Sequence, residues 1–265
     1  MHFTGRRSMS LLRHLYEQAT PVEASWGHHR IFAQAAYGIV RTTQFAPVIM
    51  AEAQDLARWF PLCWRRDASG EPVLVVFRSL LEDGQGYPGD ASYREDCLPL
   101  VFKAFPLVVP DRDSIEQRQV LADRVICDKP TDIGAPLLTP EGKFTPAALA
   151  RARLAIDVAR GLPATTAFSR ALGDNGLLEP WAVDLDIGRG RRARFDDLLI
   201  LATSRLDDPV LHGLVAEHGA EAGLLLAVHR LSLFRMSALL TAARRDVQKA
   251  AVPAPAPLDE ALSLP

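Results

Sequence analysis

The spacing of apolar residues changes near residue 144, and this change constrains the fold more than any other feature. In the first half, short apolar runs rich in β-branched and aromatic residues are separated by Pro, Gly and Asp. The clearest pair, 60–66 and 72–80, flanks the sequence DASG. This arrangement is typical of two strands joined in a hairpin. A helix is expected at 46–58, where Pro47 suits the first turn and Glu52 the positive end of the helix dipole.

The second half is dominated by helical periodicity. Thr145 is expected to cap a helix that ends at Gly161, and a second, short helix is expected to end at Gly173. The strongest helical segment, 220–245, is apolar on most faces and is expected to cross the core. The sequence therefore predicts an α+β fold: a mixed or antiparallel sheet packed by helices in the N-terminal half, and a helical C-terminal half.

Three segments are predicted along the chain. Residues 1–20 are expected to form an N-terminal helix, and residues 21–245 a single α+β domain, a length that one core can accommodate. Residues 246–265 are rich in Pro and Ala. Alternating prolines favour an extended chain, so this last segment is expected to be a flexible tail.

Composition limits the partners and the location that we expect for this protein. Thirty basic and 32 acidic residues give a formal net charge of −2, which favours neither nucleic acid nor an anionic membrane. No apolar stretch approaches the ~20 residues of a membrane span, and charged residues interrupt the N-terminus where a signal peptide would need a continuous apolar run. The three cysteines lack metal-binding spacing. We expect a cytoplasmic protein with no nucleic-acid partner and no membrane span.

A series of short motifs resembles one family. They are YGIV at 37–40, the segment carrying Pro47 and Glu52, FPLCW at 60–64, LVFKAFPLVV at 100–109, the block 134–149, the segment with Thr166 and Leu172, GLLEPW at 176–181, and His229 with Ser232. In this order and spacing, over roughly residues 20–243, the chain is similar to the SapC family. In one block, 90–106, the tyrosine-rich, doubly basic pattern of that family is reduced to Tyr93, Arg94 and Lys103.

The resemblance implies a function at the bacterial envelope. The family is associated with surface-layer proteins and their export, and many members look like accessory proteins encoded beside TonB-dependent receptors, oxygenases and flavin-dependent halogenases. The chain is therefore expected to be a non-catalytic accessory protein without a cofactor. Its expected partner is a peptide or protein, such as a halogenase, an oxygenase or an envelope protein.

The residues suggest where such a partner would bind. Aromatic side chains without an obvious catalytic set are expected to wall a groove, together with nearby charged residues. The predicted groove residues are Tyr37, Glu52, Trp59, Phe60, Tyr93, Arg94, Lys103, Phe105 and His229. For His229, a buried position hydrogen-bonded near Ser232 is the competing interpretation. Glu52 is predicted to pair with Arg65, Arg66 or Lys103, or alternatively to act as a general base.

The alternative function is an iron-dependent oxygenase or a peptide-modifying enzyme. His28 and His29 with Glu52 would supply the two-histidine, one-carboxylate set that iron prefers. Adjacent strand residues point to opposite faces, which counts against both histidines binding one ion. No hydrolase, protease or nucleotide-binding motif is present, so a non-enzyme is favoured. The basic stretch GRGRRAR, 188–194, is interpreted as a solvated hairpin tip.

Overall fold

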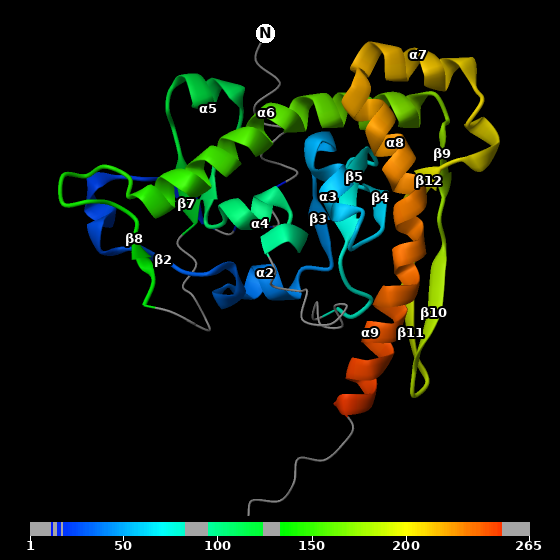
Figure 1. Ribbon diagram of the computed structural model, residues 1–265, viewed down its shortest axis with the longest axis horizontal. Coiled ribbons are helices and arrows are strands. Elements are labelled where there is room, and N and C mark those ends of the chain that lie inside the picture. Colours follow the sequence, from blue (N-terminus) through cyan, green and yellow to red (C-terminus); the bar gives the residue numbers. More distant parts are fainter. Residues whose placement is uncertain (1–11, 13–14, 17, 83–94, 124–132, 251–265) are drawn as a thin grey trace, which may run out of the picture.

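A five-stranded antiparallel sheet forms the centre of the protein, seen in a computed structural model that describes residues 12, 15–16, 18–82, 95–123 and 133–250. The strand order is β3 (Phe45–Pro47), β5 (Pro72–Phe77), β4 (Leu62–Arg66), β12 (Leu198–Leu201) and β9 (Leu178–Pro180). The long helix α6 (Pro146–Asp174) runs across one end of this sheet, and α8 (Ala220–Ser232) descends beside it (Figure 1). The α+β prediction is confirmed.

Among the described residues, three smaller antiparallel sheets accompany the central one. They are β1 (Ala19–Pro21) with β7 (Leu121–Asp123) and β6 (Leu107–Val108), β10 (Val183–Gly188) with β11 (Arg191–Phe195), and β2 (Arg30–Ile31) with β8 (Ala135–Pro136). The remaining short elements are η1 (Ala24–His28), η2 (Gln34–Ala36), α2 (Gly38–Thr42), η3 (Met50–Glu52), α3 (Ala53–Leu56), η5 (Glu95–Cys97), α4 (Leu100–Ala104), α5 (Arg112–Glu116) and η6 (Thr203–Arg205). The C-terminal part continues with α7 (Pro209–His218), α8, η7 (Leu233–Arg235) and α9 (Met236–Lys249).

Both predicted hairpins are present. Between β4 and β5, the Asp67 carboxylate accepts the backbone N–H groups of Ser69 and Glu71, and Gly70 takes a positive φ of 84°. These contacts close the turn that the DASG sequence indicated. Between β10 and β11 the turn lies at 189–190, and exposed Asp184 pairs with arginines of β11, so the basic stretch is a hairpin tip.

Helix α6 is longer than expected. It continues through Gly161 and Pro163, so the predicted helix end at Gly161 is wrong. Two of its hydroxyl groups accept hydrogen bonds from the sheet side of the core: Thr165 from the backbone N–H of Met50 and Ser169 from the indole N–H of Trp64, both at 3.0 Å. Packing over the sheet therefore outweighs the Gly and Pro signals, which local propensity alone would read as a stop.

The segment 46–58 is not the predicted helix. Pro47 lies in the edge strand β3, at a position where the sheet does not need a backbone N–H donor. Only the short η3 and α3 follow. The Val48 N–H donates to Leu74 in β5, which continues the pairing. Short helices also interrupt other apolar runs of the first half: the run 97–110 contains α4 before β6, and the run 29–43 contains α2.

The secondary structure near both ends of the predicted domain differs from the expectation. Most of the helix expected at 1–20 lies outside the described residues, but Ala19 and Thr20 form β1 with β7 rather than helix. At the other end, α9 continues to Lys249, beyond the predicted boundary at 245. The rest of the predicted tail, 251–265, lies outside the described residues.

The helical run 220–249 does not cross the core. Only one of its faces is buried, through residues such as Leu225 and Leu239, while Leu231 and Phe234 lie in solvent. By length and composition it is the only described helix that is apolar enough for a membrane span. This is weak evidence for a span, because core helices of soluble proteins meet the same criterion. The absence of a membrane span thus stays a prediction.

His229 fastens this run to the central sheet. Its Nδ1 donates to the Leu62 carbonyl at 2.8 Å, and its Nε2 accepts the Leu201 N–H at 3.2 Å, which requires the neutral ring. It lies where β4 and β12 no longer pair with each other. Ser232 accepts the Leu62 N–H and donates to the His229 carbonyl. His229 is therefore a buried, hydrogen-bonded core residue rather than a groove residue.

Burial lowers the pKa of His229 from 6.5 to about 4. The neutral ring thus contributes stability that is complete above about pH 6.5 and lost as the pH falls through about 4. We expect the stability advantage of the wild type over His229→Gln to be on the order of 3 kcal/mol at neutral pH and to shrink over this interval. Urea unfolding of both proteins at several pH values measures it. A difference independent of pH would contradict the assignment.

Candidate functional site

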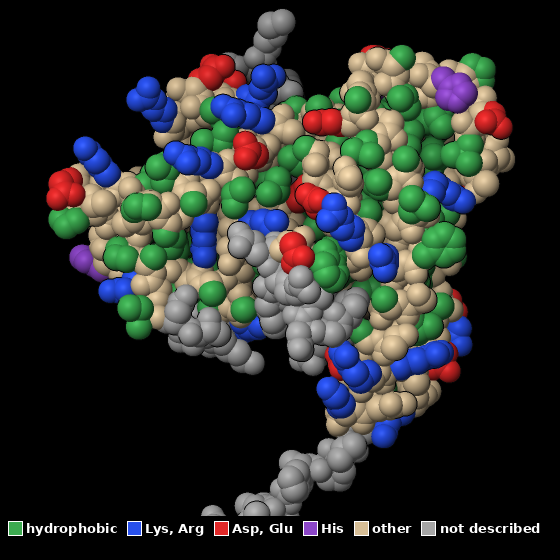
Figure 2. Space-filling view, viewed as in Figure 1, with side chains coloured by type: hydrophobic (Ala, Val, Ile, Leu, Met, Phe, Trp, Pro, Cys, Tyr) green, Lys and Arg blue, Asp and Glu red, His purple; other side chains and the backbone are tan. Residues whose placement is uncertain are grey.

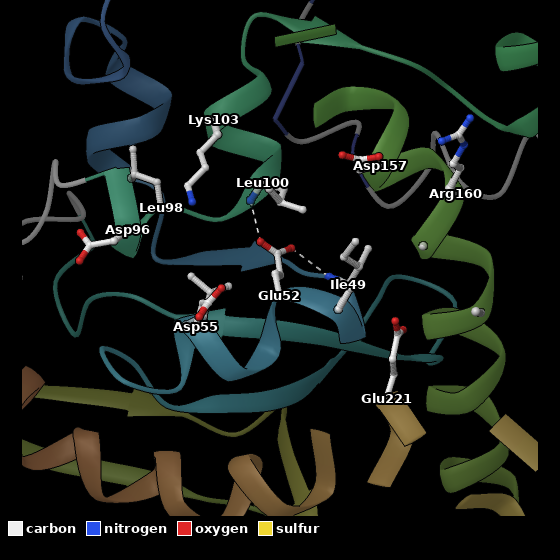
Figure 3. Close-up of a pocket in the computed structure, with 14 residues that line it drawn as sticks. Ile49, Glu52, Asp55, Asp96, Leu98, Leu100, Lys103, Asp157, Arg160 and Glu221 are labelled. Carbon is white, nitrogen blue, oxygen red and sulfur yellow. Dashed lines mark hydrogen bonds between the residues drawn. The ribbon is translucent and has the colours of Figure 1, made fainter. Parts of the chain in front are cut away.

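A cavity of about 520 Å³ lies where several helical segments meet (Figure 3). Its walls come from η3 with α3, from the segment that leads into α4, from the middle of α6 and from the start of α8. The lining residues are Ile49, Ala51, Glu52, Asp55, Leu56, Asp96, Leu98, Leu100, Lys103, Asp157, Arg160, Gly161, Ala164 and Glu221. Apolar residues form much of its wall, with charged side chains around them.

Glu52 is held rigidly in this cavity. One carboxylate oxygen accepts the Ile49 N–H at 3.0 Å, and the other accepts the Leu100 N–H at 2.7 Å. Leu100 is the first residue of α4, and Ile49 precedes η3. Glu52 therefore satisfies the free N–H groups at the start of two helical segments, which is the capping role of an acidic side chain.

Burial raises the pKa of the Glu52 carboxyl from 4.5 to about 7, because the ionised form is poorly hydrated. The two N–H donors and the positive charge of Lys103 act in the opposite direction, while Asp55 adds to the increase. The carboxyl is thus poised to change protonation near neutral pH. The predicted pairing partners Arg65 and Arg66 lie elsewhere, since Arg65 pairs with Asp197 and Arg66 bonds the Gly70 carbonyl.

The cavity is acidic. Five carboxyl groups line it, from Glu52, Asp55, Asp96, Asp157 and Glu221, against the two cations of Lys103 and Arg160. A cleft lined mainly by one sign of charge concentrates ions of the other sign. The arrangement therefore suits an amine or a guanidinium group with an apolar stem.

The structure brings together only part of the predicted groove. Glu52 and Lys103 line the cavity. Tyr37, Phe60 and Phe105 are almost fully buried in the core, as is His229, and Trp59 is half-buried against the same core. Tyr93 and Arg94 lie outside the described residues. The buried rings therefore support the fold, where Tyr37 and Phe105 meet edge to face at 5.0 Å, and do not wall a surface groove.

The alternative iron site is not assembled. Among the described residues, no group of three or more His, Cys, Asp and Glu side chains is placed to hold a metal ion. His28 and His29 are exposed in the η1–β2 segment, and His29 packs on Trp26 with ring centroids 4.4 Å apart. The set of His28, His29 and Glu52 is therefore not a metal centre in this structure.

Sequence reasoning missed most of the cavity. Asp157 and Arg160 lie one turn apart on α6, Asp96 precedes α4, and Glu221 opens α8. Each looks like an ordinary surface charge in the sequence. The available signal is weak: Asp157 and Arg160 are three residues apart in an Ala- and Leu-rich helix, and such residues share one face.

A second hollow, of about 700 Å³, lies beside β3 and the β4–β5 turn. Its cations are Arg65 and Arg66, and both are engaged within the protein, Arg65 also lying 4.7 Å from the centre of the Phe45 ring. Because both of these cations already have partners, we take the acidic cavity as the candidate site.

The fold and the site together define an α+β protein with an acid-lined cavity between its sheet and its helical half. The family model of SapC matches residues 23–239, and the chain belongs to this family. This confirms the resemblance seen in the sequence. No curated protein and no solved structure matches the chain.

Replacing Glu52 tests the capping role. Glu52→Gln keeps one acceptor but turns an amide N–H₂ toward the second N–H group, so we expect a loss of about 1–2 kcal/mol at pH 5. Because the pKa is raised in the folded chain, the wild-type contribution is complete below about pH 4.5 and lost as the pH rises through about 7. The stability difference should therefore shrink from pH 5 to 8 in chemical unfolding. A growing difference would refute the raised pKa.

Gly161 permits the close approach of α6 to η3. A Cβ at this position would lie 2.7 Å from Ile49 Cδ1 and 3.2 Å from Ile49 Cβ. We expect Gly161→Ala to lower the melting temperature, because the overpacking cost of about 1–3 kcal/mol exceeds the gain in helix propensity. Gly213→Ala, in α7 with open space around it, is the control and should be neutral or stabilising. Equal behaviour of the two variants would show that the contact yields freely.

Proposed function

We propose that this SapC-family protein is a non-catalytic accessory protein that binds a peptide or protein partner of the bacterial envelope. Surface-layer and TonB-dependent receptor systems are the contexts that the family suggests, and an oxygenase or halogenase is the other kind of partner. Family membership supports this choice. The proposed location of the protein remains the cytoplasm.

The acidic cavity supports a more specific mode of binding. Its excess of carboxyl groups over cations favours a Lys or Arg side chain, or an N-terminal amine, of the partner. The apolar walls from Ile49, Leu98 and Leu100 suit the aliphatic stem of such a side chain. Asp157 and Glu221 are exposed, on α6 and α8, and are available to meet the charge at the rim.

One observation favours the alternative of a peptide-modifying enzyme. Glu52 lines the cavity with a pKa of about 7, and such a carboxyl can accept a proton at neutral pH. Both of its oxygens, however, already accept backbone N–H groups. The capping role accounts for its position, so binding without catalysis is the preferred function.

Blocked peptides that differ only in a central Lys, Ala or Glu test the binding mode. We expect the purified chain to bind the Lys peptide best in calorimetric titrations, more weakly at high salt because the attraction is screened. Asp157→Asn should weaken this binding several-fold, roughly 1 kcal/mol. Glu116→Gln removes an exposed carboxylate from α5, outside the cavity, and should have no effect.

Peptides from the envelope proteins of the same genome test the function itself. Binding that needs Lys or Arg and is weakened by Asp157→Asn would support both proposals. Tight binding that is indifferent to Asp157 would retain the accessory function and reject the cavity. The accessory function would be rejected if the chain bound none of these peptides and neither an oxygenase nor a halogenase encoded beside it. It would also be rejected if the isolated protein turned over a peptide.

A further inference from the structure

The outer face of the helical run 220–241 exposes large apolar side chains. Leu224 is 43% exposed, Leu231 69% and Phe234 80%. Figure 2 shows apolar side chains at the surface along α8, with Lys and Arg side chains gathered over α9. Leu224 and Leu231 belong to α8 and Phe234 to the following turn η7, and three large apolar side chains on one face of such a helical run are unusual for a surface that meets only water.

These side chains recur with a regular spacing. Leu224, Ala227, Leu231, Phe234 and Ala238 are separated by alternating steps of three and four residues. This is the spacing of a coiled-coil seam, in which each side chain packs into a hole on a facing helix. The opposite face of the same run already packs on the protein core, so the seam is a second, separate face.

We propose that this seam binds the same seam of a second copy of the chain, with the two helices antiparallel. In this arrangement Phe234 lies opposite Leu224 of the partner subunit, and Leu231 opposite Ala227 of the partner subunit. Each pair then combines two side chains of different size, Phe with Leu and Leu with Ala, which fills space without overpacking. A two-fold axis near position 229 generates each contact twice, as in an isologous dimer.

The charges at the edge of the seam fit this antiparallel arrangement. Glu221 and Arg235 lie 14 residues apart, or two heptads, on the same edge of the seam. In an antiparallel pair, this edge faces itself across the two-fold axis, so Glu221 meets Arg235 of the partner subunit at both ends. Both side chains are exposed, and neither makes an ion pair with another described residue. The dimer would provide those partners.

A membrane surface fits the same face less well. A carboxylate at Glu221 on its edge is unfavourable beside anionic lipids. Insertion as a span would remove His229 and Ser232 from their hydrogen bonds to β4 and β12.

The seam has a further consequence, because Glu221 also lines the acidic cavity. Arg235 of the partner subunit would then lie at the rim of this cavity.

The test is the solution mass as a function of concentration. The seam is only one helix wide, so we expect it to bury less than the ~800 Å² per partner of a standard interface. Association should therefore be weak, in the micromolar range or above. Sedimentation equilibrium of the full chain should show a mass rising from 29.1 kDa toward twice that value. Leu231→Glu should keep the chain monomeric. Leu149→Glu changes a Leu exposed on α6 instead and should leave the association unchanged.

Charge reversal tests the antiparallel geometry. Glu221→Arg and Arg235→Glu should each weaken association several-fold, and the double variant Glu221→Arg/Arg235→Glu should restore it. Because all these side chains are exposed, folding is checked independently by circular dichroism. A wild type that stays monomeric at every concentration would overturn the proposal, as would equal effects of Leu231→Glu and Leu149→Glu. Binding of the monomer to anionic vesicles through Leu231 would assign the face to a membrane instead, and the lack of rescue would exclude the antiparallel pairing.

Discussion

The close contact between α6 and the sheet side of the core organises the rest of the structure. Thr165 and Ser169 accept hydrogen bonds from Met50 and Trp64, and Gly161 lets the helix approach Ile49. These contacts fix η3 against α6 and thereby set the position of Glu52. The cavity exists because a glycine and two hydroxyl groups allow a long helix to lie where bulkier side chains would hold it away.

Two buried titratable groups join the remaining parts to this centre. Glu52 ties η3 to α4, and His229 ties α8 to β4 and β12. Burial disfavours the charged form of both, so it raises the pKa of the acid and lowers that of the base. As the pH rises, the contribution of His229 to stability therefore increases while that of Glu52 decreases, over overlapping pH intervals. A flat stability profile of the wild type would not show that either group is inert.

The helical C-terminal half has two different faces. The inner face supplies His229 and Ser232 to the sheet, while the outer face carries the apolar seam and Glu221 at the edge of the acidic cavity. If both proposals hold, partner binding and self-association share one carboxylate. A cationic group of the bound peptide or protein would then compete with Arg235 of the partner subunit for Glu221. Binding of that peptide or protein would therefore depend on the concentration of this chain.

The sequence alone determined the fold class, the hairpins and the family, because these depend on local periodicity, turn residues and ordered motifs. In the β4–β5 turn and in the cap at Thr145, the hydrogen bonds that close the turn and cap the helix come from residues close by in the chain. It also gave Glu52 and Lys103 as site residues, but with aromatic neighbours that are in fact core. Only the tertiary structure decided which charges line the cavity and which apolar face of 220–241 stays exposed. Those outcomes depend on contacts between segments far apart in the chain, where a surface charge and a cavity charge have the same local sequence.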